Sequence, residues 1–161
     1  MKLSNQFKNL VLKQLESFGC SLGVEHLVVY IASAKDGSKA GFEVFSQWPE
    51  IDKLLMPIDD DPDLKAASPS RRWYPLQDND ILIGVLRVET EFKDSEWPLS
   101  LDSRLKALST SLAKTFSIEI ERQNNAEEIS YLRNQLGVII HQLRNPLAAL
   151  RTYAKLLIKR L

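Results

Sequence analysis

The chain has 161 residues, of which 44% are hydrophobic and 26% are charged. This length allows one sizeable folded core with an appendage and leaves little room for two full domains. The 21 Lys and Arg residues balance the 21 Asp and Glu residues, so no global field favours nucleic acid or an anionic membrane surface.

The N-terminus and the cysteine content indicate a cytoplasmic protein. The first 18 residues alternate charged and apolar groups, which excludes a signal peptide. No run approaches the ~20 apolar residues that span a bilayer. Cys20 is the single cysteine, which excludes an internal disulfide framework and a zinc site built from several cysteines of one chain.

The first part of the chain predicts one helix and two strands. Apolar residues recur at steps of three and four between positions 3 and 18, the pattern of an amphipathic helix, and Gly19 ends it. The segments HLVVYIAS (26–33) and AGFEVFSQW (40–48) are rich in branched and aromatic residues. We expect them to form paired antiparallel strands around a turn at 35–39.

The middle of the chain predicts an irregular crossover and a second strand pair. Residues 49–70 contain four prolines and the acidic run DDDPD, a composition typical of loops. Strands are predicted at 71–77 and 81–90, with DND as their turn. With a final helix from about Trp97, this order predicts an α+β fold with an antiparallel sheet flanked by helices.

The final helix carries two different patterns. Its first part has apolar residues on one face and is expected to pack on the sheet. The polar stretch ERQNNAEE (121–128) follows, and we place a domain boundary there, with a first domain at 1–123 and a second at 124–161.

Beyond this boundary the apolar residues repeat at alternating steps of three and four, which predicts a coiled-coil seam. An isolated helix would leave this seam in water, so we expect a homodimer through the C-terminal helices. Assemblies larger than a dimer are an alternative. The seam residues are Ile129, Leu132, Leu136, Ile139 and Leu143.

The seam is interrupted at the segment HQLRNP. After Leu143 the next apolar position is Leu147, so two successive steps of four occur, and such a stutter locally unwinds a supercoil. Pro146 removes the backbone hydrogen bond to the Gln142 carbonyl, at a cost of ~3 kcal/mol. We expect the helix to bend there.

The heptad assignment places His141 on the outer face of this helix. A neutral imidazole has a ring nitrogen with a free lone pair that can attack an electrophile. Arg144 and Asn145 lie one turn further on, where a guanidinium can pair with phosphate oxygens and a carboxamide can orient water. These groups suit phosphoryl transfer at His141, although a lone surface histidine is usually only a solvated side chain.

The word HQLRNPL resembles the phosphoacceptor box of sensor histidine kinases and matches six of its seven positions. The resemblance implies that His141 accepts phosphate from ATP and passes it to an aspartate of a response regulator. Asn145 matches the position that aligns water for dephosphorylation. Gln142 stands where the family has an acid and cannot take a proton at neutral pH, so phosphorylation is expected to be slow or to use another base.

The family continues into a second helix and an ATP-binding domain, whereas this chain stops at Leu161 without a glycine-rich phosphate loop of that type. We therefore expect a fragment of a protein histidine kinase that is inactive alone, with ATP used only by the domain it lacks.

The N-terminal arrangement resembles a GAF domain, because RRWYPLQDNDILIGVLRVE (71–89) is similar to the late strands of that fold. PAS and related sensor folds have similar strands. A GAF domain followed by this phosphoacceptor helix is similar to cyanobacterial sensor kinases related to chloroplast sensor kinase. That resemblance implies a redox response linked to photosynthetic electron transport, with a quinone or other redox signal.

The same resemblance implies an iron–sulfur cluster in the first domain, for which Cys20 is the only cysteine ligand. Other thiolates would have to come from further chains. Two other interpretations of Cys20 stay open beside the cluster ligand: a small buried structural cysteine and a redox-sensitive thiol. His26 is expected to satisfy a strand end rather than bind a metal.

Two other functions remain open. A non-catalytic GAF module for ligand binding or dimerisation predicts the same dimer without a role for His141. An enzyme of the methionine sulfoxide reductase kind requires several cysteines and is disfavoured by Cys20 alone.

Overall fold

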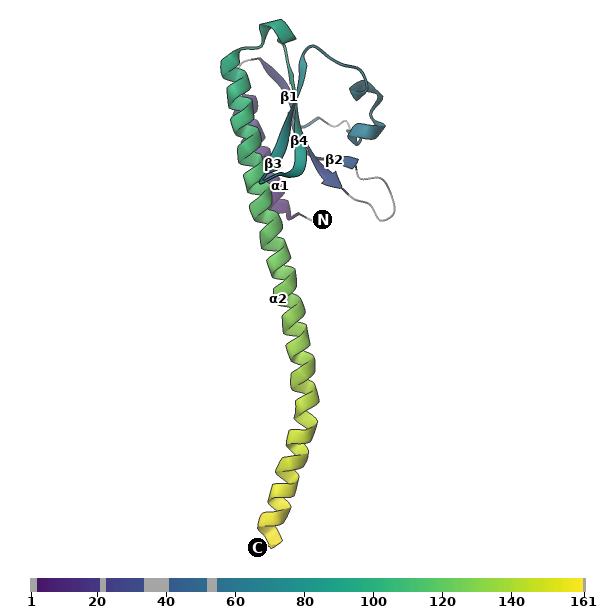
Figure 1. The fold of residues 1–161 in the computed structure, drawn as a ribbon, viewed down its shortest axis with the longest axis vertical. Helices are drawn as coiled ribbons and strands as arrows, with labels where there is room; N and C mark the ends of the chain where they lie inside the picture. The colour runs from purple at the N-terminus through teal and green to yellow at the C-terminus, as the bar shows by residue number, and fades with distance from the viewer. Residues whose placement is uncertain (1–2, 21–22, 34–40, 52–54, 161) are drawn as a thin grey trace. The chain divides into compact units, whose positions relative to one another are not determined.

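The computed structural model describes residues 3–20, 23–33, 41–51 and 55–160 (Figure 1). The predicted turn at 35–39 lies outside these ranges. Near the end of the last helix, the side chains at 145, 147, 149–153 and 156–160 are also outside the description.

The predicted α+β fold is confirmed. The elements in chain order are α1 (Asn5–Gly19), β1 (Val24–Ser33), β2 (Gly41–Trp48), the short 3₁₀ helices η1 (Ile58–Asp60) and η2 (Pro62–Leu64), β3 (Arg71–Asp78), β4 (Ile81–Thr90), η3 (Asp94–Glu96) and α2 (Leu99–Arg160). The crossover between β2 and β3 thus holds two single turns of 3₁₀ helix within its described part.

Helix α1 begins and ends as its sequence suggests. The Ser4 hydroxyl accepts a hydrogen bond from the Phe7 amide at 3.2 Å, which caps the first turn. Val11 and Leu15 are fully buried on the inner face. At the other end, the aromatic ring of Trp48 packs so closely on Gly19 that a Cβ atom would clash with it.

The sheet has four antiparallel strands in the order β2-β1-β4-β3. Both predicted antiparallel strand pairs are present, and β1 also pairs with β4 in the centre of the sheet. Asn79 and Asp80 join β3 to β4 with positive φ angles of 47° and 66°, as a type I′ turn requires.

The core lies between one face of the sheet and the two helices. Leu27 and Leu86 from the central strands are fully buried against Leu15 of α1 and Leu112 of α2. The ring of Phe116 meets the rings of Phe7 and Phe45 edge to face, with centroids 5.0 Å apart in both pairs. The first turns of α2 are therefore part of this core, as predicted.

Two of the three tryptophans close off this core, and Trp73 does not. Trp97 is buried in the core and Trp48 packs against it. Trp73 lies on the edge strand β3 and is 40% exposed, because its side chain points away from the helices.

The chain divides into two compact units, Met1–Ile120 and Glu121–Leu161. The first contains the sheet, α1 and the start of α2. The second is the remainder of α2. The predicted boundary at 123/124 stays a prediction.

Candidate functional site

The predicted phosphoacceptor residues all belong to α2, which is one continuous helix from Leu99 to Arg160. His141, Gln142, Arg144 and Pro146 are exposed. The side chain of Asn145 is outside the description. The helix thus presents His141 to solvent, where another molecule can reach its ring.

The helix continues through Pro146. Proline has no amide hydrogen, so its nitrogen cannot donate to the Gln142 carbonyl one turn earlier. That carbonyl therefore lies next to His141 without the bond that other residues of the helix would supply. The expected bend stays a prediction.

The apolar seam is exposed in the single chain. Leu136 is 58% exposed and Leu143 is 53% exposed, and the other seam residues that were predicted have similar values. Apolar side chains in this regular pattern gain little from a lone helix. A partner helix would cover these side chains, and the dimer stays a prediction.

A shallow depression of about 870 Å³ surrounds the histidine on the outer face of α2. It is lined by Arg133, Asn134, Gly137, Val138, His141, Gln142 and Arg144. Sequence reasoning missed Arg133 and Gly137. Their spacing could have identified them from the sequence. Gly137 lies four and Arg133 eight positions before His141, and such positions fall on the same side of a helix.

Cys20 lies at the end of α1, where its amide donates to the Glu16 carbonyl at 3.2 Å. Its side chain is a free, exposed thiol, so the buried-cysteine interpretation is wrong. Among the described residues, no group of three or more His, Cys, Asp or Glu side chains could hold a metal ion. One exposed cysteine per chain supplies only one of the ligands of an iron–sulfur cluster.

His26 is held in a polar cluster on the sheet. The Gln47 side-chain oxygen can only accept, so Nε2 of His26 donates to it at 3.3 Å. Nδ1 then accepts from Arg87 at 3.2 Å. Burial lowers the pKa of His26 from its ordinary value of 6.5, and the Arg87 charge lowers it further. Both ring nitrogens are occupied, which agrees with a structural role.

Arg87 is the buried centre of this cluster. Its side chain is only 5% exposed and lies 3.6 Å from Glu89. It also donates to the Tyr30 hydroxyl at 2.9 Å. Glu89 is shared with Arg71 at 3.0 Å. These contacts compensate the buried charge.

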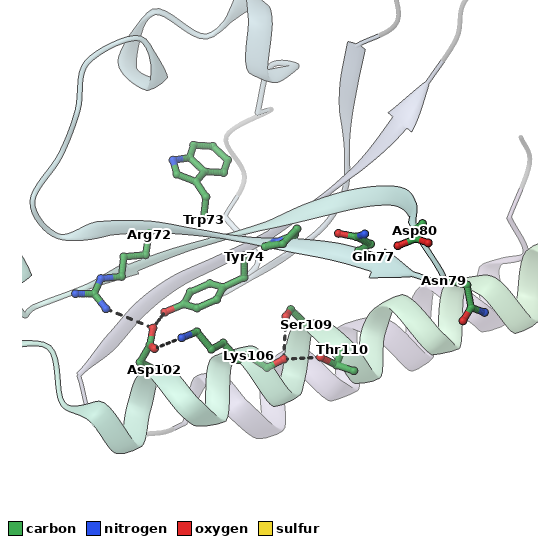
Figure 2. A pocket seen from close by; sticks show the side chains of 11 residues that line it. Arg72, Trp73, Tyr74, Gln77, Asn79, Asp80, Asp102, Lys106, Ser109 and Thr110 are labelled. Atoms are coloured by element: carbon green, nitrogen blue, oxygen red, sulfur yellow. Dashed lines mark hydrogen bonds and ion pairs between the residues drawn. The ribbon is translucent and has the colours of Figure 1, made fainter.

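A second depression, of about 730 Å³, lies between β3 and the start of α2 (Figure 2). At its edge Tyr74 donates to Asp102 at 2.7 Å, and Arg72 and Lys106 reach the same carboxylate at 3.3 and 2.8 Å. The hydrogen bonds from Lys106 and Tyr74 lower the pKa of Asp102. Burial, followed by the bond to Asp102, raises the pKa of Tyr74. This network attaches α2 to the edge strand.

In the described part of the chain, no helix has the length and apolar character needed to cross a membrane.

The chain is similar over nearly its whole length to a bacterial signalling protein. It is 28% identical to the sensor histidine kinase Hik2 of Thermosynechococcus vestitus over 179 aligned positions, which cover 98% of this chain and 46% of that protein. The chain therefore spans a little under half the length of this relative. No family model matches the chain, and no solved structure matches it. The similarity supports a protein related to histidine kinases.

Proposed function

We propose that this chain is the sensory and phosphoacceptor portion of a two-component sensor histidine kinase, with His141 as the phosphoacceptor. The observation that carries the proposal is an exposed His141 within HQLRNPL on a continuous helix. The similarity to Hik2 extends along nearly all of the chain and supports the same function.

The proposed chemistry uses few groups of this chain. A ring nitrogen of His141 attacks the terminal phosphorus of ATP held by a separate catalytic domain, forming a P–N bond as the bond to ADP breaks. The phosphoryl group then passes to an aspartate of a response regulator. Arg144 lies one turn away and can pair with phosphate oxygens, while Gln142 can accept a hydrogen bond but no proton.

We assign residues 1–123 as a GAF-type sensor domain. The antiparallel sheet, its helical face and the α1-to-α2 core are compatible with this assignment. Dimerisation through the seam of α2 is part of the proposal, because it would cover the exposed leucines. A redox role is also proposed for Cys20, as an exposed thiol or as one ligand of a cluster shared between copies.

Visible absorption separates the two forms of the redox proposal. Anaerobically purified protein with iron and a visible band, both lost in Cys20→Ser, would support a shared cluster. Colourless protein without iron would leave only the thiol. If the labelling of His141 depends on redox state in the wild type and loses this dependence in Cys20→Ser, the thiol is supported. If Cys20→Ser keeps the same redox dependence as the wild type, a redox role of Cys20 is contradicted in both forms.

Labelling tests the main proposal. The chain is incubated with the catalytic domain of Hik2 and γ-labelled ATP, and the protein-bound label is tested for stability. We expect acid-labile, base-stable label in the wild type and in Lys155→Gln, an exposed matched control four turns away. His141→Ala should carry none. Label that persists in His141→Ala would refute the assignment.

One observation favours a second candidate. Gln142 replaces the acid of the family box, as would be tolerated in a non-catalytic ligand-binding or dimerisation module. That module predicts an unlabelled wild-type chain whose assembly and ligand binding do not change in His141→Ala.

A further inference from the structure

The helix around His141 has an uneven charge. Residues 129–161 contain six Arg and Lys residues and no acidic residue. Among the described side chains, Arg133, Arg144 and Lys155 are exposed. A ligand that approaches this part of α2 therefore meets only positive or neutral side chains, which favours an anion.

Three of the residues in the depression line up beside His141. Arg133 and Arg144 are eleven positions apart, which is close to three helical turns, so they lie on nearly the same line along α2. Gly137 lies between them on that line. A Cβ atom at Gly137 would have nothing within 4 Å, so the surface there is an open notch at a position between the two arginines along the helix.

The two arginines cannot serve the same phosphoryl group. With a rise of about 1.5 Å per residue, Arg144 lies about 4.5 Å beyond His141 along the axis, whereas Arg133 lies about 12 Å before it. Arg144 can therefore contact a phosphoryl group on the ring. Arg133 is placed to contact another phosphate of a longer ligand that lies across the notch.

We propose that Arg133 and the Gly137 notch bind the phosphate chain of a polyphosphate donor, with its terminal phosphate at His141 and Arg144. The inference rests on the proposed function and specifies how His141 distinguishes its two phosphoryl partners. A nucleoside triphosphate reaches Arg133, whereas an aspartyl phosphate has a single phosphate and does not.

Arg133 has a competing role that the test must separate. In the heptad it flanks the seam, and Glu128 lies five positions earlier, the spacing of an ion pair between parallel helices. Glu128→Gln removes that ion pair and leaves the depression intact. The variant Glu128→Gln therefore measures how far the loss of this ion pair at the seam changes ligand binding, with Arg133 itself unchanged.

The test measures tripolyphosphate and inorganic phosphate binding to the 161-residue chain through the NMR signals of the His141 ring. His26 is an internal reference, because both of its nitrogens are occupied within the sheet. Variants are Arg133→Gln and Gly137→Gln, with Lys155→Gln as the charge-matched control. Gly137→Ala controls for helix propensity.

We expect Arg133→Gln to weaken tripolyphosphate binding by about three- to fivefold, the effect of losing one exposed charged contact. Gly137→Gln should weaken it by about as much, because the longer side chain fills the notch. Phosphate binding should not change in Arg133→Gln, and both controls and Glu128→Gln should resemble the wild type. Unchanged tripolyphosphate binding in Arg133→Gln, an equal loss for both ions, or an equal loss in Lys155→Gln or Glu128→Gln would overturn the proposal.

Failure of this inference is distinct from failure of the proposed function. Unlabelled wild-type chain in the ATP experiment refutes His141 as phosphoacceptor whatever the ion binding shows. Labelled wild type, with Arg133→Gln labelled at the same rate, refutes the role of Arg133 and leaves His141 in place. A labelling rate that falls about threefold or more in Arg133→Gln, but not in Lys155→Gln, supports both.

Discussion

At the scale of single residues, Gln142 is the position that most directly limits the phosphorylation proposed for His141. A carboxylate beside the ring could take or orient the proton that leaves during phosphorylation, whereas a carboxamide can only accept a hydrogen bond. General-base assistance typically contributes about 10²- to 10⁴-fold. Gln142 is exposed, so a glutamate fits there without repacking.

We therefore predict that Gln142→Glu raises the initial rate of His141 labelling by at least about tenfold. Rapid-quench labelling with the catalytic domain of Hik2 measures this rate. Gln135→Glu, one heptad earlier on an exposed turn, controls for the added negative charge. Equal rates in the wild type and Gln142→Glu would show that the proton leaves by another route.

His26 predicts a pH dependence of stability. Its pKa is lowered in the folded chain by burial and by Arg87, so the unfolded chain binds the proton more readily below pH 6.5. Folding stability should be fully present above that pH and fall as the pH drops toward the lowered pKa. Urea unfolding between pH 8 and pH 5 measures the decline, and His26→Gln should flatten it. An unchanged slope in His26→Gln would contradict this assignment.

Residue contacts could be predicted from sequence where they are local and could not where they depend on strand pairing. Helical spacing alone places Arg144 one turn from His141, whereas the roles of His141, Gln142 and Arg144 stay predictions, because the seam residues beside them are exposed as well. The contact of Arg87 with Tyr30 and His26 requires β1 to pair with β4, which no local pattern specifies. The Asp102 network likewise joins residues about 30 positions apart.

At the scale of elements, the sequence determines the helices and hairpins more fully than the order of the strands. The end of the first helix at Gly19, the turn within DND and the alternation within the strands are local features, and each was predicted from nearby residues. The central position of β1 and β4 is a long-range property. It depends on how the two helices together cover one face of the sheet.

The seam of α2 gives a prediction at this scale. Leu136→Asp places a charge in the middle of the exposed apolar stripe, where a dimer would bury it without a partner. We expect at least a tenfold rise in the dimer dissociation constant, measured by sedimentation equilibrium. Val138→Asp is the matched control, because Val138 is as exposed at 56% but lies off the seam. Equal effects of the two substitutions would place the dimer contact elsewhere.

At the scale of the whole molecule, the zero net charge is the sum of a long acidic segment and a short basic one. Residues 1–128 contain 15 basic and 21 acidic residues, whereas residues 129–161 contain six basic residues and no acidic one. Overall composition therefore gave no indication of the cationic helix around His141. Charge counted by segment would have shown it from sequence alone.

The division at Ile120 and Glu121 predicts different folding behaviour for the two units. Phe116 is fully buried and belongs to the core of the first unit, so residues 1–120 keep every buried contact of the sheet and its helices. The large apolar side chains of the second unit that are described, from Ile129 to Leu143, are all about half exposed. A helix in this state is marginal without a partner.

We expect a chain of residues 1–120 to unfold in one cooperative thermal transition with a midpoint that does not depend on protein concentration. A peptide of residues 121–161 should gain helix as its concentration rises, because association covers its seam. Circular dichroism at several concentrations measures both. Leu136→Asp should remove the concentration dependence of the peptide, whereas Val138→Asp should preserve it. A broad, non-cooperative transition in residues 1–120 would show that the core of the first unit needs the rest of α2.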